Sequence, residues 1–278
     1  MPAYNLTFIY IETVLLIVLA VFLVYKSLKL TQLFKQLSEL KRVYHDQIVV
    51  DKERDDFLAM LVHELRSPLS VMKGAADLML KDASRLSKEQ IETLLEQIKN
   101  SSIGMLKIVN DILDVSKIDS GKFEVTKKPQ DINALLSSEC QYYQALALTK
   151  QIKLECTLDT TLPPVNFDSD RIRQVLNNLI SNAIKFTQDS GVITVRSRKN
   201  QAQVFVSIED TGDGISDTMK HKLFHKFVQL GTHPGVKEHG TGLGLVVAKG
   251  IVEAHGGEIW IEDNKPKGAK FVFSIPLI

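Results

Sequence analysis

The sequence predicts a multidomain protein with an N-terminal transmembrane helix, a helical hairpin that pairs with a second copy as a four-helix bundle, and a C-terminal α/β sandwich. Three observations predict this architecture: an apolar run near the N-terminus, two helical stretches with broad apolar faces, and strand-like alternation after about residue 120. The 278 residues are 44% hydrophobic and 24% charged, which is typical of chains that fold. The chain has 34 Lys and Arg and 33 Asp and Glu, so it lacks the basic excess of a general nucleic-acid binder. No nucleic-acid partner is therefore expected.

Residues 6–25 form a nearly unbroken apolar run whose only formal charge is Glu12. About 20 helical residues cross the hydrocarbon core of a bilayer, so the run predicts a single-pass anchor in contact with lipid. A cleaved signal peptide has basic residues in front of its apolar run, whereas here they follow it, at Lys26, Lys29 and Lys35. This positive charge places the C-terminal bulk in the cytoplasm, at the cell membrane. Glu12 is either an intramembrane sensing group or, as its position near the outer end favours, a hydrated interfacial carboxylate.

A short coiled-coil pattern follows the apolar run. Large apolar side chains recur at alternating spacings of three and four, at Leu30, Leu33, Leu37, Leu40 and Tyr44. The pattern favours a continuous helix that leaves the membrane. A solvated amphipathic linker remains the alternative, because only about two heptads keep apolar residues at both core positions.

Two amphipathic helices are expected next, and they form a hairpin. The apolar face of the first carries Phe57, Met60, Leu61, Leu65, Pro68 and Met72, and that of the second carries Ile91, Leu94, Leu95, Ile98, Met105, Ile108, Val109 and Ile112. Ser87 and Gln90 have the spacing of a capping box between them, and Gly121 stands where a C-terminal cap is expected. A lone pair of helices cannot bury two such broad faces, so the pattern predicts a homodimer.

From about residue 120 onward the hydrophobic period changes to alternation. Strands are predicted at residues 122–126, 152–158, 192–198, 204–209, 258–261 and 270–275. Helices are predicted at 132–150, 170–185 and 243–255, which gives an α/β sandwich. Residues 230–240 have no apolar period, and a loop of this kind in a compact domain is usually a functional lid.

The predicted helix 170–185 carries a polar stripe. Steps of about 100° per residue place Asn178, Asn182 and Lys185 on one narrow face. Carboxamide oxygens are hard neutral ligands that suit Mg²⁺ when substrate phosphates balance its charge, and a lysine can contact those phosphates. An ordinary exposed polar face is the alternative interpretation of this helix taken alone.

Two glycine motifs accompany the stripe. Asp210 ends a predicted strand and is followed by Gly212, Gly214 and Ile215, so a carboxylate that can accept from an adenine amino group stands beside glycines that admit close backbone approach. The motif Gly240-Thr241-Gly242-Leu243-Gly244-Leu245 opens a helix whose N-terminal N–H groups suit an anion. The glycines are spaced G-x-G-x-G and follow a loop, so the motif is not the G-x-G-x-x-G fingerprint of dinucleotide-binding proteins.

His63 lies opposite the apolar face of the first hairpin helix, so its imidazole is expected to be exposed. A neutral imidazole is a competent nucleophile at cytoplasmic pH. Glu64 can orient the ring and take its proton. A zinc peptidase is excluded because Ser67 stands where a second histidine is needed, and Pro68 predicts a bend just after the histidine.

These motifs together resemble a known family. The order Asn-x3-Asn-x2-Lys, Asp-x-Gly-x-Gly, Phe-x2-Phe, then Gly-x-Gly-x-Gly is similar to the ATP-binding fold of histidine kinases, gyrase-type and MutL-type ATPases and Hsp90 chaperones, the GHKL or Bergerat-type fold. The run His-Glu-Leu-Arg-Ser-Pro-Leu that begins at His63 resembles the phosphoacceptor box of sensor histidine kinases of bacterial two-component systems. The resemblance covers residues 57–278.

The resemblance implies a role for each motif residue. His63 would be phosphorylated with Glu64 as its base, and ATP and Mg²⁺ would be the cofactors. Asn182 would hold the metal with help from Asn178. The other nucleotide contacts would come from Lys185 and Phe186, from Asp210, Gly212, Gly214 and Ile215 around adenine, from Phe224, Phe227 and Lys237 at the lid, and from Gly240, Thr241, Gly242, Leu243, Gly244 and Leu245 at the triphosphate.

The chain departs from the family pattern at two places. Many relatives carry a lid arginine that engages the γ-phosphate, whereas this lid offers only Lys237 with His233 and His239. Lysine cannot reproduce bidentate contacts, which leaves the catalytic contribution of the lid open. Ser67 stands where members with strong phosphatase activity usually carry Thr or Asn, so dephosphorylation of the partner is open as well.

The resemblance implies a membrane-anchored, homodimeric sensor histidine kinase that phosphorylates itself on His63 and passes the phosphoryl group to an aspartate of a separate response regulator. Two alternatives are a catalytically idle dimeric scaffold that regulates another kinase and an ATPase or chaperone of the same nucleotide-binding superfamily. An ATPase or chaperone would have no use for the His63 motif. The predicted units are a transmembrane anchor at 1–25, a helical linker at 26–52, a dimerisation and phosphotransfer domain at 53–119, and a catalytic ATP-binding domain at 120–278.

Overall fold

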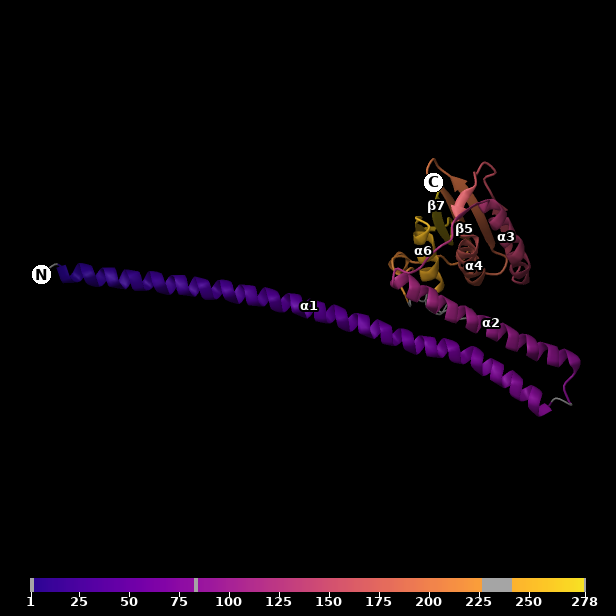
Figure 1. Cartoon of the computed structure of the whole chain (residues 1–278), viewed down its shortest axis with the longest axis horizontal. Helices are drawn as coiled ribbons and strands as arrows, with labels where there is room; N and C mark the ends of the chain where they lie inside the picture. Colours follow the sequence, from indigo (N-terminus) through magenta and orange to yellow (C-terminus); the bar gives the residue numbers. More distant parts are fainter. Residues whose placement is uncertain (1–2, 83–84, 227–241, 278) are drawn as a thin grey trace. The chain divides into compact units, whose positions relative to one another are not determined.

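The computed structural model describes residues 3–82, 85–226 and 242–277. By its contacts the chain divides into two compact units, residues 1–59 and 60–278. Two long helices come first, α1 (Ala3–Asp82) and α2 (Lys88–Asp119), and Figure 1 labels them with the elements that follow. The later helices are α3 (Ile132–Thr149), α4 (Ser169–Phe186), α5 (Asp217–Lys220) and α6 (Gly244–Ala254). The strands are β1 (Lys128–Gln130), β2 (Lys153–Thr157), β3 (Val165–Phe167), β4 (Val192–Lys199), β5 (Gln203–Asp210), β6 (Ile259–Asp263) and β7 (Ala269–Pro276).

The described part of the first unit is helix α1. Within it, residues Thr13–Arg42 are long and apolar enough to cross a membrane, by length and composition. The predicted anchor and the predicted linker are both helical, because α1 runs through them without interruption. That the anchor crosses a bilayer and that the linker pairs as a coiled coil stay predictions. The side chain of Glu12 lies outside the described residues.

The hairpin in the second unit is built from the end of α1 and from α2. Met60, Leu65 and Met72 are half-buried and Leu61 is buried, as the predicted apolar face of α1 requires. Many other apolar side chains stay open in the single chain, and Leu80 is 84% exposed. The hairpin therefore has apolar surface left for a partner. Pro68 lies inside α1 and does not end it, so the predicted bend remains a prediction.

Both predicted caps of α2 are confirmed. Ser87 Oγ accepts a hydrogen bond from the Gln90 N–H at 3.3 Å, and Gln90 Oε1 accepts one from the Ser87 N–H at 2.9 Å. At the other end Gly121 adopts a φ of +65°, a conformation that favours glycine. The Lys122 N–H donates to Lys117 O at 2.9 Å, which satisfies a carbonyl of the last turn.

The C-terminal domain is an α/β sandwich, as predicted. Its five-stranded sheet has the order β2-β4-β5-β7-β6, with β2 parallel to β4 and every other neighbouring pair antiparallel. Helices α3, α4 and α6 contact the sheet, and α4 also contacts α3 and α6 (Figure 1). Leu176, Ile208 and Phe273 are fully buried between the two layers. The domain thus has a continuous core of its own.

The predicted strand at residues 122–126 is wrong. This segment is a connector with no strand, and the pairing that exists is between β1 and β3, which the sequence analysis did not predict. The connector is held by side chains instead: the Thr126 N–H donates to Asp168 Oδ2 at 2.9 Å, and the Arg171 guanidinium lies 4.8 Å above the Phe123 ring. A backbone group bonded to a side chain is not available to a ladder.

Candidate active site

His63 stands on the outside of α1, as predicted. Its side chain is 74% exposed, whereas that of the neighbouring Glu64 is only 16% exposed. His63 Nδ1 and Glu64 Oε1 are 4.0 Å apart, which is too long for a hydrogen bond but close enough for a carboxylate to attract a ring proton. Most of the imidazole thus faces solvent, and its Nδ1 lies on the side of the Glu64 carboxylate. This is the arrangement that a nucleophilic imidazole needs.

Asp210 ends β5 in the interior of the C-terminal domain and is 4% exposed. Its Oδ1 accepts from the N–H groups of Gly212 at 2.9 Å and Ala269 at 3.1 Å. Burial raises the pKa of this carboxyl, and the two backbone hydrogen bonds act in the opposite direction. Because both bonds use Oδ1, Oδ2 is the oxygen that can accept from a ligand amino group.

The glycines after Asp210 shape its surroundings. A Cβ on Gly212 would lie 2.5 Å from Phe186 O and 3.0 Å from Asp210 Oδ1, so only glycine fits there. Gly214 has a φ of +75°, which also favours glycine. Ile215 is half-buried next to it. Gly212 thus lies against the Asp210 carboxylate, and the role of Gly212, Gly214 and Ile215 around adenine stays a prediction.

The opposite wall around Asp210 is the turn between β6 and β7, which was not predicted from the sequence. Asn264 Nδ2 donates to Asp210 O at 2.7 Å, and the Ala269 N–H bonds the carboxylate. A Cβ on Gly268 would lie 1.8 Å from Asp210 O. A Lys-Pro-Lys-Gly turn signal was available in the sequence, but the signal alone does not indicate which strand end the turn covers.

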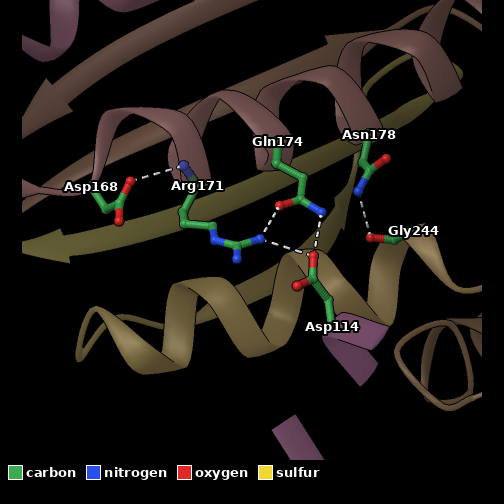
Figure 2. A network of polar contacts seen from close by, with 6 residues as sticks. All are labelled: Asp114, Asp168, Arg171, Gln174, Asn178 and Gly244. Atoms are coloured by element: carbon green, nitrogen blue, oxygen red, sulfur yellow. Dashed lines mark hydrogen bonds and ion pairs between the residues drawn. The ribbon is translucent and has the colours of Figure 1, made fainter. Parts of the chain in front are cut away.

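The polar stripe of α4 is only partly exposed. Asn178 is 4% exposed and its Nδ2 donates to Gly244 O at 3.0 Å (Figure 2), which argues against an ordinary exposed polar face. The contact uses the amide nitrogen and leaves the carbonyl oxygen, which is the atom a hard cation prefers. Asn182 is half-buried one turn later, and the Lys185 ammonium lies 5.4 Å from the Phe186 ring.

These carboxamides fit a phosphate-bound Mg²⁺ better than a metal held by the protein alone. No cluster of three or more His, Cys, Asp or Glu that could hold a metal exists in the part of the chain that the structure describes. Neutral oxygen ligands bind such an ion weakly unless phosphates supply the negative charge. Asn178 and Asn182 would therefore hold the ion together with a nucleotide.

Helix α6 begins beside this stripe. Gly242 has a φ of +67°, and Leu243 is fully buried at the N-cap. The backbone N–H groups of this turn suit the anionic end of a nucleotide. A Cβ on Gly244 would lie 3.2 Å from the Asn178 side chain, so the two motifs meet closely. Leu245 and Phe224 are half-buried, and Phe227, Lys237, Gly240 and Thr241 lie outside the described residues.

Two families match the chain in the same order as its motifs. The family described as His Kinase A (phospho-acceptor) domain matches residues 53–121. The family described as Histidine kinase-, DNA gyrase B-, and HSP90-like ATPase matches residues 167–278. The chain belongs to the sensor histidine kinases. For this histidine kinase the first match contains His63 and Glu64, and the second contains the Asp210 cradle and the α4 stripe.

Individual relatives agree with this assignment. The chain is 35% identical over 225 residues to the circadian input-output histidine kinase CikA of Synechococcus elongatus, which covers 80% of this kinase and 30% of CikA. The crystal structure of full-length ShkA in complex with AMPPNP matches with a TM-score of 0.60 at 30% identity, over 79% of this kinase and 45% of ShkA. The histidine kinase ThkA in complex with the response regulator protein TrrA matches with a TM-score of 0.57 at 26% identity, over 80% and 61% of the two chains. This kinase spans less than half the length of the curated relatives it matches.

Proposed function

We propose that this histidine kinase transfers the γ-phosphoryl group of ATP to Nε2 of its own His63 and then to an aspartate of a separate response regulator. The observation that carries the proposal is the presence, in one chain, of an exposed histidine beside a carboxylate and of a buried carboxylate cradle next to a carboxamide stripe. ShkA was crystallised with AMPPNP, which supports a nucleotide as the ligand of the second site.

Nucleotide binding is assigned to three groups of residues. Asp210 Oδ2 accepts from the adenine amino group while Gly212 and Ala269 hold Oδ1 in place. Asn182 and Asn178 would hold Mg²⁺, which neutralises phosphate charge when bound, and Lys185 contacts phosphate. The backbone of residues 242–245 at the start of α6 receives the triphosphate. Phe186, Ile215 and Phe224 border the pocket with half-buried side chains.

The proton movement follows from the orientation of His63. A neutral imidazole attacks the γ-phosphorus through Nε2, a P–N bond forms, and ADP leaves as the P–O bond breaks. The ring becomes cationic, and its Nδ1 proton passes to Glu64, whose Oε1 is 4.0 Å away in the resting state. General-base help of this kind contributes typically about 10²–10⁴-fold to a rate. ThkA was crystallised with the response regulator TrrA, which supports a receiver domain as the next acceptor.

The remaining parts of the proposal concern assembly. The apolar side chains left open on the hairpin support a homodimeric four-helix bundle, and the apolar stretch of α1 supports a single-pass anchor in the cell membrane. We assign residues 1–25 to the anchor, 26–52 to the linker, 53–119 to dimerisation and phosphotransfer, and 120–278 to catalysis. Sedimentation of residues 52–278 should give a dimer at micromolar concentration, and a monomer would contradict this assembly.

The deciding experiment incubates the full chain in detergent with γ-labelled ATP. The label should be acid-labile and base-stable, as a phosphohistidine is, and it should be absent from His63→Gln. A scaffold would take up no label, and an ATPase would release phosphate without labelling the protein. His255 serves as an internal control, because it is 3% exposed and both of its ring nitrogens have bonding partners. Label on His63→Gln protein would refute the assignment.

A further inference from the structure

The chain has two cysteines, and neither takes part in the proposed reaction. Cys140 lies on α3 and is 6% exposed, whereas Cys156 lies on β2 and is exposed. Helix α3 packs on β2. A buried thiol and an open thiol therefore come from two elements in contact, one in each layer of the sandwich.

Strand alternation turns Cys156 toward the helical layer. Residues two apart on a strand share a face, so Cys156 lies on the same side of β2 as Leu154, which is buried. The partner of Cys156 in the parallel ladder is Val195 on β4, which is fully buried as well. Strand β2 is at the edge of the five-stranded sheet, which leaves Cys156 open to solvent although it faces the helices. A small oxidant can therefore reach this sulfur.

The buried face of α3 carries the other thiol. Its side chains recur at spacings of three and four, at Leu136, Glu139, Cys140, Tyr143 and Ala147. Cys140 thus belongs to the face that meets the sheet, and its thiol donates a hydrogen bond to the sulfur of Cys156. Both residues are free cysteines. The two sulfurs are therefore neighbours across the contact between α3 and β2, where they can form a bond.

The hydrogen bond makes the two thiols unequal. It lowers the pKa of Cys156, because an S–H donor stabilises the thiolate, and burial acts in the opposite direction. The same hydrogen bond raises the pKa of Cys140, and burial, the Cys156 thiolate and the Glu139 charge add to the rise. The thiolate is the nucleophilic form of cysteine. Cys156 is therefore the more reactive of the two, and Cys140 is placed to attack the product that forms on it.

We propose that Cys156 and Cys140 form a peroxide-reactive pair, in which Cys140 first activates Cys156 and then closes a disulfide with it between α3 and β2. The Cys156 thiolate attacks one oxygen of hydrogen peroxide. An S–O bond forms, the O–O bond breaks, and the hydroxide that leaves takes a proton from solvent. The proposal is independent of the proposed kinase function.

The second step consumes the sulfenic acid formed on Cys156. The sulfur of Cys140 attacks the sulfur of Cys156, an S–S bond forms, and the S–O bond breaks. The hydroxide leaves as water with the proton of Cys140. Two electrons thus pass from the two thiols to one peroxide, and a thiol reductant reverses the change. A sulfenic acid without a neighbouring thiol is instead open to further, irreversible oxidation.

The test treats the full chain in detergent with hydrogen peroxide and without ATP. Peptide mapping under non-reducing conditions should find the segments that contain Cys140 and Cys156 joined within one chain. Dithiothreitol should separate them, because a disulfide is reducible. The variant that carries both Cys140→Ser and Cys156→Ser has no thiol, and it is the control for oxidation elsewhere in the chain.

Single variants assign the order of the steps. Cys140→Ser keeps a hydrogen-bond donor beside Cys156 but cannot form the disulfide, so oxidation should stop at a sulfenic acid on Cys156 that dimedone traps. Cys156→Ser should leave Cys140 as a thiol under the same treatment, because Cys140 is buried. If Cys140→Ser folds poorly, Cys140→Ala provides the same trap.

Cys140→Ala also tests the activation of Cys156, because it removes the donor. The pH of half-maximal alkylation of Cys156 by iodoacetamide should lie about one unit higher than in the unmodified chain, the scale of a lost hydrogen bond to a charged group. The proposal is overturned if this profile does not move, if dimedone labels Cys140 first, or if Cys156 joins two chains instead. Oxidation of Cys156 to a sulfinic acid in the unmodified chain, without a disulfide, would also overturn it. Failure of the kinase function would change none of these results, because no measurement uses ATP.

Discussion

The hairpin and the catalytic domain each hold a histidine, and the two occupy opposite surroundings. His63 on α1 is 74% exposed at its side chain, and its Nδ1 lies 4.0 Å from Glu64 Oε1. His255 at the end of α6 is 3% exposed, its Nε2 accepts from the Asp168 N–H at 3.0 Å, and its Nδ1 lies 2.7 Å from Ile251 O. Because Nε2 of His255 accepts a hydrogen bond, Nδ1 is the ring nitrogen of His255 that carries the proton.

The difference separates two uses of one side chain. A nucleophile needs an open face and a nearby base, so His63 is left with few contacts. A structural histidine satisfies buried backbone groups, so His255 joins the start of α4 to the end of α6. Burial lowers the pKa of His255, and Lys127 acts in the same direction, which keeps this ring neutral. Exposure and hydrogen bonding distinguish the two roles.

The largest expected effect comes from removing the open histidine. His63→Gln should abolish labelling while the midpoint of thermal unfolding stays within about 2 °C, because an exposed side chain contributes little to stability. Trp260, the single tryptophan, reports on folding of the catalytic domain. A large loss of stability would show that His63 also supports the hairpin, which would weaken the contrast with His255.

The next effect concerns the buried carboxylate. Asp210→Asn can still accept from Gly212 and Ala269 through its oxygen, so the fold should persist. Its NH₂ group would then face the adenine amino group, donor against donor. ATP affinity should fall about ten-fold or more, the scale of a lost charge-assisted hydrogen bond of about 1.5–3 kcal/mol. Calorimetry with ATP checks this, with Asp213→Asn at the exposed rim as the matched control.

Removing the buried histidine should act on stability. His255→Ala leaves the Asp168 N–H without its acceptor and opens a cavity, at a cost of about 2–4 kcal/mol. Denaturant unfolding followed through Trp260 measures the change. Stability should also fall with acid: because the folded pKa is lowered, the unfolded chain binds the proton more readily below about pH 6.5. His255→Gln should reduce this dependence. An unchanged pH profile would contradict the structural role.

The smallest effect is expected where Asp114 on α2 contacts Arg171 and Gln174 on α4. Acid should strengthen this contact, whereas it weakens the surroundings of His255. Asp111 is 3% exposed and lies one turn before Asp114; burial raises its pKa to about 6, Asp114 adds to the rise, and Lys107 and Gln174 oppose it. The stabilisation that protonated Asp111 gives to this contact is therefore complete below its unfolded pKa of about 3.9, and it is lost as the pH rises through about 6. Lowering the pH from 7 to 5 should raise the protection factors of amides 111–122, in which the intrinsic pH dependence of exchange is divided out, by about two- to three-fold. Asp111→Asn should remove that change.

Sequence patterns predicted the elements with a clear period and missed those without one. Strands β4, β5 and β7 were found within about two residues of their bounds, because eight residues give several alternations. Strands β1 and β3 have three residues each, too few for a period. The connector at 122–126 alternates without pairing, because side chains of α4 and its cap hold it.

The candidate site shows the same limit. The positions of His63 and Asn178 followed from helical angles, and the place of Asp210 followed from a strand end. Asn264, Gly268 and Ala269 could not be found, because their contact with Asp210 depends on the antiparallel register between β5 and β7. The pairing of Cys140 with Cys156 carried no signal in the sequence either, since the spacing of two cysteines does not indicate that α3 packs on β2.

Asp168 has a consequence for building hybrid kinases from parts. Its Oδ1 caps α4 through the Arg171 N–H, its Oδ2 holds the Thr126 N–H of the connector, and its own N–H bonds His255. The connector's share of this junction is a backbone group, which any residue except proline supplies. A foreign hairpin joined at residue 120 would therefore keep the junction intact, whereas a joint placed after Thr126 would import a connector of different length and break it. The position of Thr126 sets the boundary at which modules of this chain can be exchanged.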